Sequence, residues 1–128
     1  MNIVKYLWQL PQHTLALLIC TACCVRLISE YEDVRVYRVP YKFGLSLGQY
    51  IFVHYSASRT TWAHEYGHSL QSRMLGPLYL LIVGLPSITM NILTRLGILS
   101  ADNYYKRWPE NWADTLGKVD RDTGNPQV

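Results

Sequence analysis

A chain of 128 residues has room for one hydrophobic core and little room for a second domain. Its formal charge of +3 is spread over scattered arginines and lysines, so it lacks the concentrated basic patch that a nucleic-acid-binding protein requires. Only 16% of the residues are charged, compared with about 25% in soluble domains. We therefore expect part of the surface to be buried in lipid or against a partner protein.

The N-terminal segment, residues 1–29, is the first apolar part of the chain. Its largely apolar run, residues 14–25, is shorter than the roughly 20 residues that cross a bilayer as a helix. The run fits a signal-peptide core or an interfacial helix as well as a membrane span. Because Pro11 would break a longer helix, we expect two helical pieces, residues 3–10 and 12–29.

The three cysteines of the chain, Cys20, Cys23 and Cys24, all lie in this run. The C-x-x-C spacing occurs in redox and zinc sites, but a second pair of ligands is missing from the sequence. Cysteines this close together cannot join distant parts of a fold. We expect them to be small buried apolar side chains.

Two strands are predicted between residues 34 and 55. Residues 34–39 alternate apolar and charged side chains, which is the period of a half-exposed strand. Residues 48–55 are rich in aromatic and β-branched side chains and form the second predicted strand. We expect the pair to make a small antiparallel sheet or hairpin, and the second strand to offer its edge to an extended peptide.

Helices are predicted over most of residues 60–119. The first covers residues 62–75, with Thr60 or Thr61 as its N-cap. The apolar stretch that follows, residues 78–99, is expected to divide near Gly84 into two shorter helices.

The last predicted helix runs from Pro109 to about Leu116, because proline is favoured at the first position of a helix and Gly117 follows as a stop signal. Residues 120–128 are expected to form a polar, frayed tail. The predicted fold is thus a single α+β domain, in which the helix of residues 62–75 packs on the last helix.

A metal-binding motif, His64-Glu65-Tyr66-Gly67-His68, lies on the first of these helices. Residues four apart share one helix face, so His64 and His68 can direct two imidazoles at one point. Glu65 lies one position further round, where a carboxylate can reach a water on the metal without binding the metal itself. Gly67 leaves room for another segment to approach closely.

The last helix supplies a second pair of polar side chains with the same spacing, in Glu110-Asn111-Trp112-Ala113-Asp114. A catalytic zinc ion takes three protein ligands and a water, so Glu110 can complete the ligand set with the two histidines. Asp114 can then hold a ligand histidine by its free ring N–H. The sequence therefore predicts one zinc site.

The two motifs together resemble the gluzincin clan of metallopeptidases, whose second helix contributes E-x-x-x-D. The combination of H-E-x-G-H with E-x-x-A-D is closest to the membrane-bound branch similar to CAAX prenyl proteases. The resemblance implies that His64, His68 and Glu110 bind zinc, that Glu65 is the general base and acid, and that Asp114 supports a ligand. It covers mainly residues 60–75 and 108–117, so the chain would be a minimal version.

The expected activity is hydrolysis of peptide bonds in a peptide or protein substrate. A second donor is then needed for the oxyanion, and the sequence offers Tyr104, Tyr105, Arg107 and His54 without singling one out. We name Tyr105 as the candidate, with packing and interface anchoring as the alternative role of Tyr104 and Tyr105. Gln71, which follows the motif, is expected to lie on a solvated or interface-facing turn.

Two other interpretations remain open at this stage: a zinc-stabilised membrane interaction module, and an inactive metallopeptidase-like subunit that works through a partner protein. Glu65 favours catalysis, because a structural site needs no such residue and is usually closed by four ligands. The predicted location is a membrane, the bacterial inner membrane, on account of the apolar runs and the nearby tryptophans.

Overall fold

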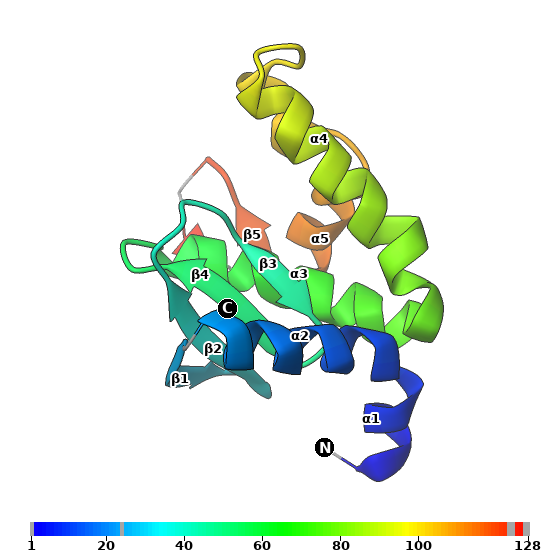
Figure 1. Cartoon of the computed structure of the whole chain (residues 1–128). Helices are drawn as coiled ribbons and strands as arrows, with labels where there is room; N and C mark the ends of the chain where they lie inside the picture. The colour runs from blue at the N-terminus through cyan, green and yellow to red at the C-terminus, as the bar shows by residue number, and fades with distance from the viewer. Residues whose placement is uncertain (1, 24, 123–124, 127–128) are drawn as a thin grey trace.

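Four short strands form one mixed sheet in the computed structural model, which describes residues 2–23, 25–122 and 125–126 (Figure 1). The strands are β1 (Arg26–Tyr31), β2 (Val34–Val39), β3 (Leu45–Leu47) and β4 (Tyr50–His54), in the order β1-β2-β4-β3. β2 is antiparallel to β1 and parallel to β4, and β3 is antiparallel to β4. The expected α+β class is confirmed, with a small mixed sheet and several helices.

The two predicted strands exist, as β2 and β4, but the prediction that they pair antiparallel is wrong. The residues between them contain a further strand, β3, which turns back at Gly48 and lies on the far side of β4. β4 therefore lies inside the sheet, between β2 and β3. The prediction that residues 48–55 provide a free edge is also wrong, because β3 is the edge strand on that side.

Each face of the sheet carries its own apolar cluster because neighbouring side chains of a strand point to opposite faces. One cluster packs against Ala16 of helix α2 and contains Val39, Leu47, Tyr50 and Phe52. The other packs against Trp62 and Tyr66 of helix α3 and contains Val34, Val36, Ile51 and Val53. Burying an aliphatic or Phe side chain stabilises a fold by about 1.5–3 kcal/mol. The sheet is thus held between α2 and α3.

The N-terminal helices are α1 (Ile3–Trp8) and α2 (Leu10–Cys23), and the break between them falls at Gln9, close to the predicted place. The predicted second helix is too long, because residues 26–31 pair with β2 as strand β1 instead. Cys20 is half-buried and Cys23 is exposed at the end of α2, so the expected burial of Cys23 is wrong. Cys24 lies outside the described residues.

Helix α3 (Arg59–Leu75) begins earlier than predicted. Its N-cap is Ser58, whose hydroxyl oxygen accepts a hydrogen bond from the Thr61 N–H at 3.4 Å. Thr60 and Thr61 lie inside the helix, so neither is the cap. Ser58 has the extended backbone that an N-cap requires, and the helix ends at Gly76 with a φ of 56°.

The chain stays helical for most of the next 20 residues, through a 3₁₀ turn η1 (Gly76–Leu78), a π-helical turn η2 (Leu80–Gly84) and helix α4 (Leu85–Arg95). The expected division at Gly84 is a change of hydrogen-bonding pattern and not a break, because Gly84 itself keeps helical φ and ψ angles. Pro86 lies in the first turn of α4, where a missing N–H is tolerated.

The C-terminal part consists of η3 (Ala101–Lys106), α5 (Glu110–Leu116) and a two-stranded ribbon of β5 (Val119–Asp120) and β6 (Asn125–Pro126). The helix α5 and its end before Gly117 are as predicted, but it begins at Glu110, and Pro109 is its N-cap and not its first residue. The predicted frayed tail is wrong where it is described, because residues 119–120 pair with residues 125–126. Residues 123–124 and 127–128 lie outside the described part.

Among the described residues, the structure contains no helix with both the length and the apolar character needed to cross a membrane. Association with a membrane stays a prediction. In Figure 1, α4 projects away from the sheet, and the loop after it forms one extremity of the molecule.

Candidate metal centre

Helices α3 and α5 cross in close contact at Gly67. A Cβ atom at this position would overlap the backbone carbonyl of Ala113, so only glycine allows the two helices to approach this closely. The expectation that Gly67 admits another segment is confirmed. The crossing brings the polar side chains of α5 within reach of the two histidines of α3.

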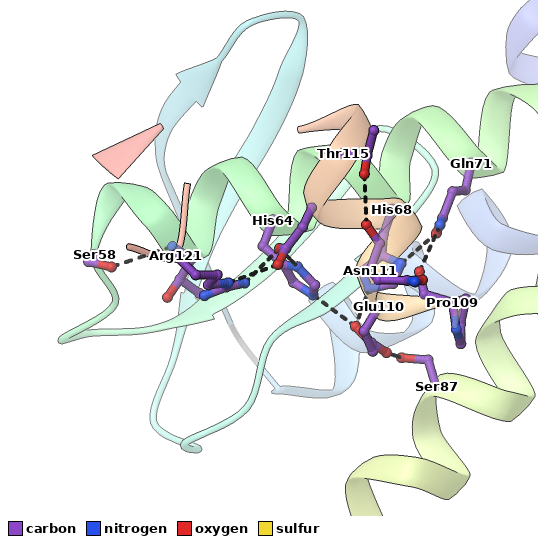
Figure 2. A network of polar contacts seen from close by, with 12 residues as sticks. Ser58, His64, His68, Gln71, Ser87, Pro109, Glu110, Asn111, Thr115 and Arg121 are labelled. Atoms are coloured by element: carbon purple, nitrogen blue, oxygen red, sulfur yellow. Dashed lines mark hydrogen bonds and ion pairs between the residues drawn. The ribbon is translucent and has the colours of Figure 1, made fainter. Parts of the chain in front are cut away.

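Three side chains converge at this crossing. Glu110 Oε2 lies 2.9 Å from His64 Nε2 and 2.9 Å from His68 Nε2 (Figure 2). One ligand atom from each of the three residues lies within 4.8 Å of the others, and all three residues are buried. Two imidazoles and a carboxylate are the donor types that bind zinc and related metals, so this cluster can hold a metal ion.

The outer nitrogen of each imidazole has its own acceptor. His64 Nδ1 lies 2.6 Å from Asp114 Oδ1, and His68 Nδ1 lies 2.7 Å from Gln71 Oε1. The Gln71 amide is fixed because its Nε2 donates to the Pro109 carbonyl oxygen at 3.1 Å (Figure 2). Both Nδ1 atoms therefore carry the proton, and in a neutral ring the Nε2 lone pair faces inward.

This arrangement fits a bound cation. Two nitrogen lone pairs and a carboxylate oxygen point at one another, so positive charge is needed between them. In the protein alone a proton supplies that charge: burial would lower the pKa of His64, but hydrogen bonds with Asp114 and Glu110 raise it to about 9. A metal ion can satisfy the same three atoms at once.

Glu110 is held from two sides. Burial would raise its pKa, but the hydrogen bonds with His64 and His68 lower that pKa well below its usual value. Its second oxygen, Oε1, accepts a hydrogen bond from Ser87 Oγ of α4 (Figure 2). Glu110 thus stays ionised, with Oε2 directed at the histidines. Ser87 was not among the predicted site residues.

Asp114 is paired with an arginine from the predicted tail. Arg121 donates to Asp114 from Nε at 2.8 Å and from a terminal nitrogen at 2.7 Å. Burial would raise the pKa of Asp114, but the bonds with His64 and Arg121 lower it. The guanidinium carbon of Arg121 lies 3.5 Å from the centre of the Tyr105 ring, which in turn meets the His64 ring edge-on at 5.1 Å.

Glu65 is buried next to this cluster and lines the same cavity as His64, His68 and Glu110. Within the described part of the chain, its carboxylate takes part in none of the hydrogen bonds or ion pairs. Its pKa is raised by burial, although His68 and His64 oppose the shift. Gly44 lies against the carboxylate, and a Cβ atom there would overlap it.

The cavity has a volume of about 670 Å³ and is lined by residues of β3, α3, α4 and η3. Both Tyr104 and Tyr105 line it. The two other candidates for an oxyanion donor lie elsewhere: His54 Nδ1 is 2.7 Å from Ser56 Oγ, and Arg107 donates to the Ser100 carbonyl oxygen at 3.4 Å. Neither is among the lining residues.

Gln71 has a different place from the one predicted. It is fully buried and bonded to His68, whereas a solvated or interface-facing turn was expected. The signal was present in the sequence, because a residue three positions after His68 lies on the same helix face. Ser87 and Arg121 have no such local signal.

No family model, curated protein or solved structure matches this chain. Membership of the gluzincin clan therefore stays a prediction that rests on the two motifs.

Proposed function

We propose that this protein is a zinc-dependent metallopeptidase of gluzincin type, with His64, His68 and Glu110 as zinc ligands and Glu65 as general base. The observation that carries the proposal is the state of Glu65. A buried carboxylate without a partner in the described structure is costly for folding. Such a group is expected where it acts on a bound molecule, and this one lines the cavity beside the cluster.

The number and type of ligands support catalytic zinc. Structural zinc sites are usually closed by four protein ligands and rich in cysteine, whereas a catalytic site has three protein ligands and keeps one position open. The described cysteines, Cys20 and Cys23, belong to α2 and are not part of the cluster. When bound, zinc lowers the pKa of a coordinated water to about 7 and polarises the carbonyl of the substrate.

In this proposal, side chains of the protein carry out the proton transfers. Glu65 takes a proton from the attacking water and passes it to the departing amine nitrogen as the peptide C–N bond breaks. Burial raises the pKa values of both Tyr104 and Tyr105, so both hydroxyls keep their protons at neutral pH and can donate to the carbonyl oxygen. We retain Tyr105 as the first candidate because its ring contacts His64.

The edge strand β3 is the proposed docking site for the peptide backbone. Leu45, Ser46 and Leu47 all line the cavity, and β3 pairs with β4 on its other side. An extended peptide can add to such an edge through main-chain hydrogen bonds. The hydroxyl of Ser46 is buried without a hydrogen-bond partner in the described structure. Tyr79 already donates to the Ser46 carbonyl oxygen at 3.0 Å.

The test is Glu65→Gln, measured as zinc content and as cleavage of a library of fluorescence-quenched peptides. Zinc content should not change, and activity should fall by about 10² to 10⁴-fold, because general-base assistance contributes that much. Glu30→Gln, at an exposed carboxylate of β1, is the control and should alter neither quantity.

The competing interpretation is a structural zinc site in an interaction module. It predicts full function in Glu65→Gln together with unfolding in Glu110→Ala, because only the ligands would matter. That pair of results would remove the peptidase proposal and leave the metal site.

A further inference from the structure

Helix α2 has polar side chains inside and apolar side chains outside. Gln12 and His13 are fully buried, and Gln12 Nε2 donates to Ser72 Oγ of α3 at 3.0 Å. Leu17 and Leu18, on the same helix, are 48% and 61% exposed. A helix on the surface of a protein in water has the opposite arrangement.

The segment of η2 and α4 also exposes large apolar side chains. Its polar residues Ser87 and Asn91 line the cavity together with the apolar Leu85, Ile88 and Ile92, and Ser87 bonds to Glu110. Leu81 of η2 is 66% exposed, and none of the residues of α4 is buried. The loop at the end of the projecting helix α4 carries Leu96, which is 68% exposed (Figure 1).

These two regions, together with the adjoining α1 and η1, hold most of the large hydrophobic side chains that are exposed in the described structure. We call them together the apolar face, which consists of Ile3, Val4, Leu7, Trp8, Leu10, Leu15, Leu17, Leu18, Leu78, Leu81, Ile82, Leu85, Ile88, Ile92, Leu96 and Ile98. Exposed apolar side chains in this number are expected only where another apolar surface covers them.

The segments that form the apolar face carry basic residues and no acidic ones, and the nearest acidic side chains beside Lys5 are those of Glu30 and Asp33. The sequence has no Asp or Glu in residues 1–29 or in residues 66–101. The exposed charges in and next to the apolar face include those of Lys5, Arg26 and Arg95. An anionic surface complements this face, whereas a second copy of the chain would present the same positive charge to it.

We propose that the apolar face binds the interfacial region of an anionic lipid bilayer. The apolar side chains enter the boundary between head groups and acyl chains, and the basic residues contact the head groups. Trp8 suits this boundary, because its ring is half exposed while its Nε1 donates to the Arg73 carbonyl oxygen at 3.0 Å.

The bilayer then lies at the mouth of the cavity. Leu15 of α2 and Ile88 of α4 line the cavity and are also exposed, so both helices border its opening. A substrate would reach the metal cluster from the membrane side. The conclusion that the substrates are membrane-associated peptides rests on the proposed peptidase function. The proposal that the protein binds the bilayer is independent of that function.

The test measures cosedimentation of the purified full chain with vesicles of phosphatidylcholine and phosphatidylglycerol. Combined replacement of Leu18, Leu81 and Leu96 by Ser should lower the partition coefficient by about 100-fold, because three apolar side chains leave the bilayer. None of the three lines the cavity. The control replaces Leu27 and Tyr55 by Ser, which are 52% and 57% exposed outside the apolar face, and should bind as the wild type does.

A second variant keeps the apolar side chains and removes charge. Lys5→Gln with Arg26→Gln should weaken binding to the anionic vesicles by roughly 5-fold per residue and leave binding to pure phosphatidylcholine unchanged. Equal partition of the triple variant and its control would overturn the inference. So would a stable detergent-free dimer that does not bind vesicles.

Different results would contradict the peptidase proposal and the membrane-binding proposal. Glu65→Gln should bind vesicles as the wild type does, because Glu65 lies in the cavity and not on the apolar face. Loss of vesicle binding in a chain that cleaves peptides normally would remove this inference alone.

Discussion

The two ends of the candidate metal site, His64 and His68, are supported by different chemistry. At one end, His64 faces the carboxylate of Asp114, which is paired in turn with the guanidinium of Arg121. At the other end, His68 faces the neutral amide of Gln71, which is fixed by a backbone carbonyl. Both ends set the same tautomer, with the proton on Nδ1, but only the first adds charge.

The difference between Asp114 and Gln71 distinguishes two effects that a hydrogen-bond partner can have on a ligand histidine. A carboxylate both orients an imidazole and raises its basicity, whereas an amide mainly orients it. The cluster already contains the charge of Glu110 and the nearby charge of Glu65. A second charged partner would add more negative charge to a buried site, so a neutral partner at His68 limits the cost of burial.

The largest effect is expected from the ligands themselves. Replacement of either His64 or His68 by Ala should lower metal affinity by more than about 100-fold, because two ligands remain where three are needed. Elemental analysis after dialysis measures this as metal per chain. Equal and near-complete losses would show that the two ends are equivalent as ligands. Retention of metal by one of the two variants would show that the replaced histidine is not a ligand, and the comparison of the two ends would then fail.

Asp114→Asn is expected to have the next largest effect, a loss of metal affinity of roughly 10 to 100-fold. The amide oxygen can still accept from His64 Nδ1–H, but the charge that raises the basicity of the ring is lost and Arg121 loses its ion pair. Competition with a chromogenic chelator gives the affinity. The control is Asp102→Asn, at an exposed position of η3. A change in thermal stability alone would mean that Asp114 only holds α5 and Arg121 in place.

Gln71→Met should lower metal affinity by about 10-fold, the smaller end of the range for such supporting residues. Methionine has a similar helix propensity and length, so the variant removes the hydrogen bonds without disturbing the helix. It also leaves the buried Nδ1–H of His68 without its acceptor, which costs about 1–3 kcal/mol of stability, whereas the Pro109 carbonyl oxygen keeps the Ala113 N–H as a donor. Affinity is therefore measured well below the melting temperature. A loss equal to that in Asp114→Asn would show that charge adds nothing at His64.

The predicted part of the site is the part that local spacing determines. His64 and His68, like Glu110 and Asp114, are four residues apart on one helix, so each pair shares a face whatever the rest of the fold does. Gly67 also carried a readable signal, since glycine in a helix interior is unfavourable without a packing reason. The sequence therefore indicated both helix faces.

The unpredicted part depends on contacts between distant segments. Arg121 reaches Asp114 only because β5 directs the chain back along α5, and Ser87 reaches Glu110 only because α4 passes the start of α5. Strand β3 is similar: its side chains are ordinary, and its place at the sheet edge follows from pairing with β4. Local periodicity contains no information on such pairings.

Arg121→Lys should have the smallest effect, a loss of metal affinity of about 2 to 5-fold. Lysine keeps the positive charge that stabilises the Asp114 carboxylate, but it cannot donate in the two-pronged geometry of a guanidinium or stack on Tyr105 in the same way. The Arg121 side chain is partly exposed, so water screens the pair and limits the loss. Chelator competition at two salt concentrations measures the effect, with Arg107→Lys as the matched control. If the charge of the Asp114–Arg121 pair is what distinguishes the His64 end, Arg121→Met should lower metal affinity clearly more than Arg121→Lys does. Equal losses of metal affinity in the two variants would show that Arg121 acts by packing on Tyr105.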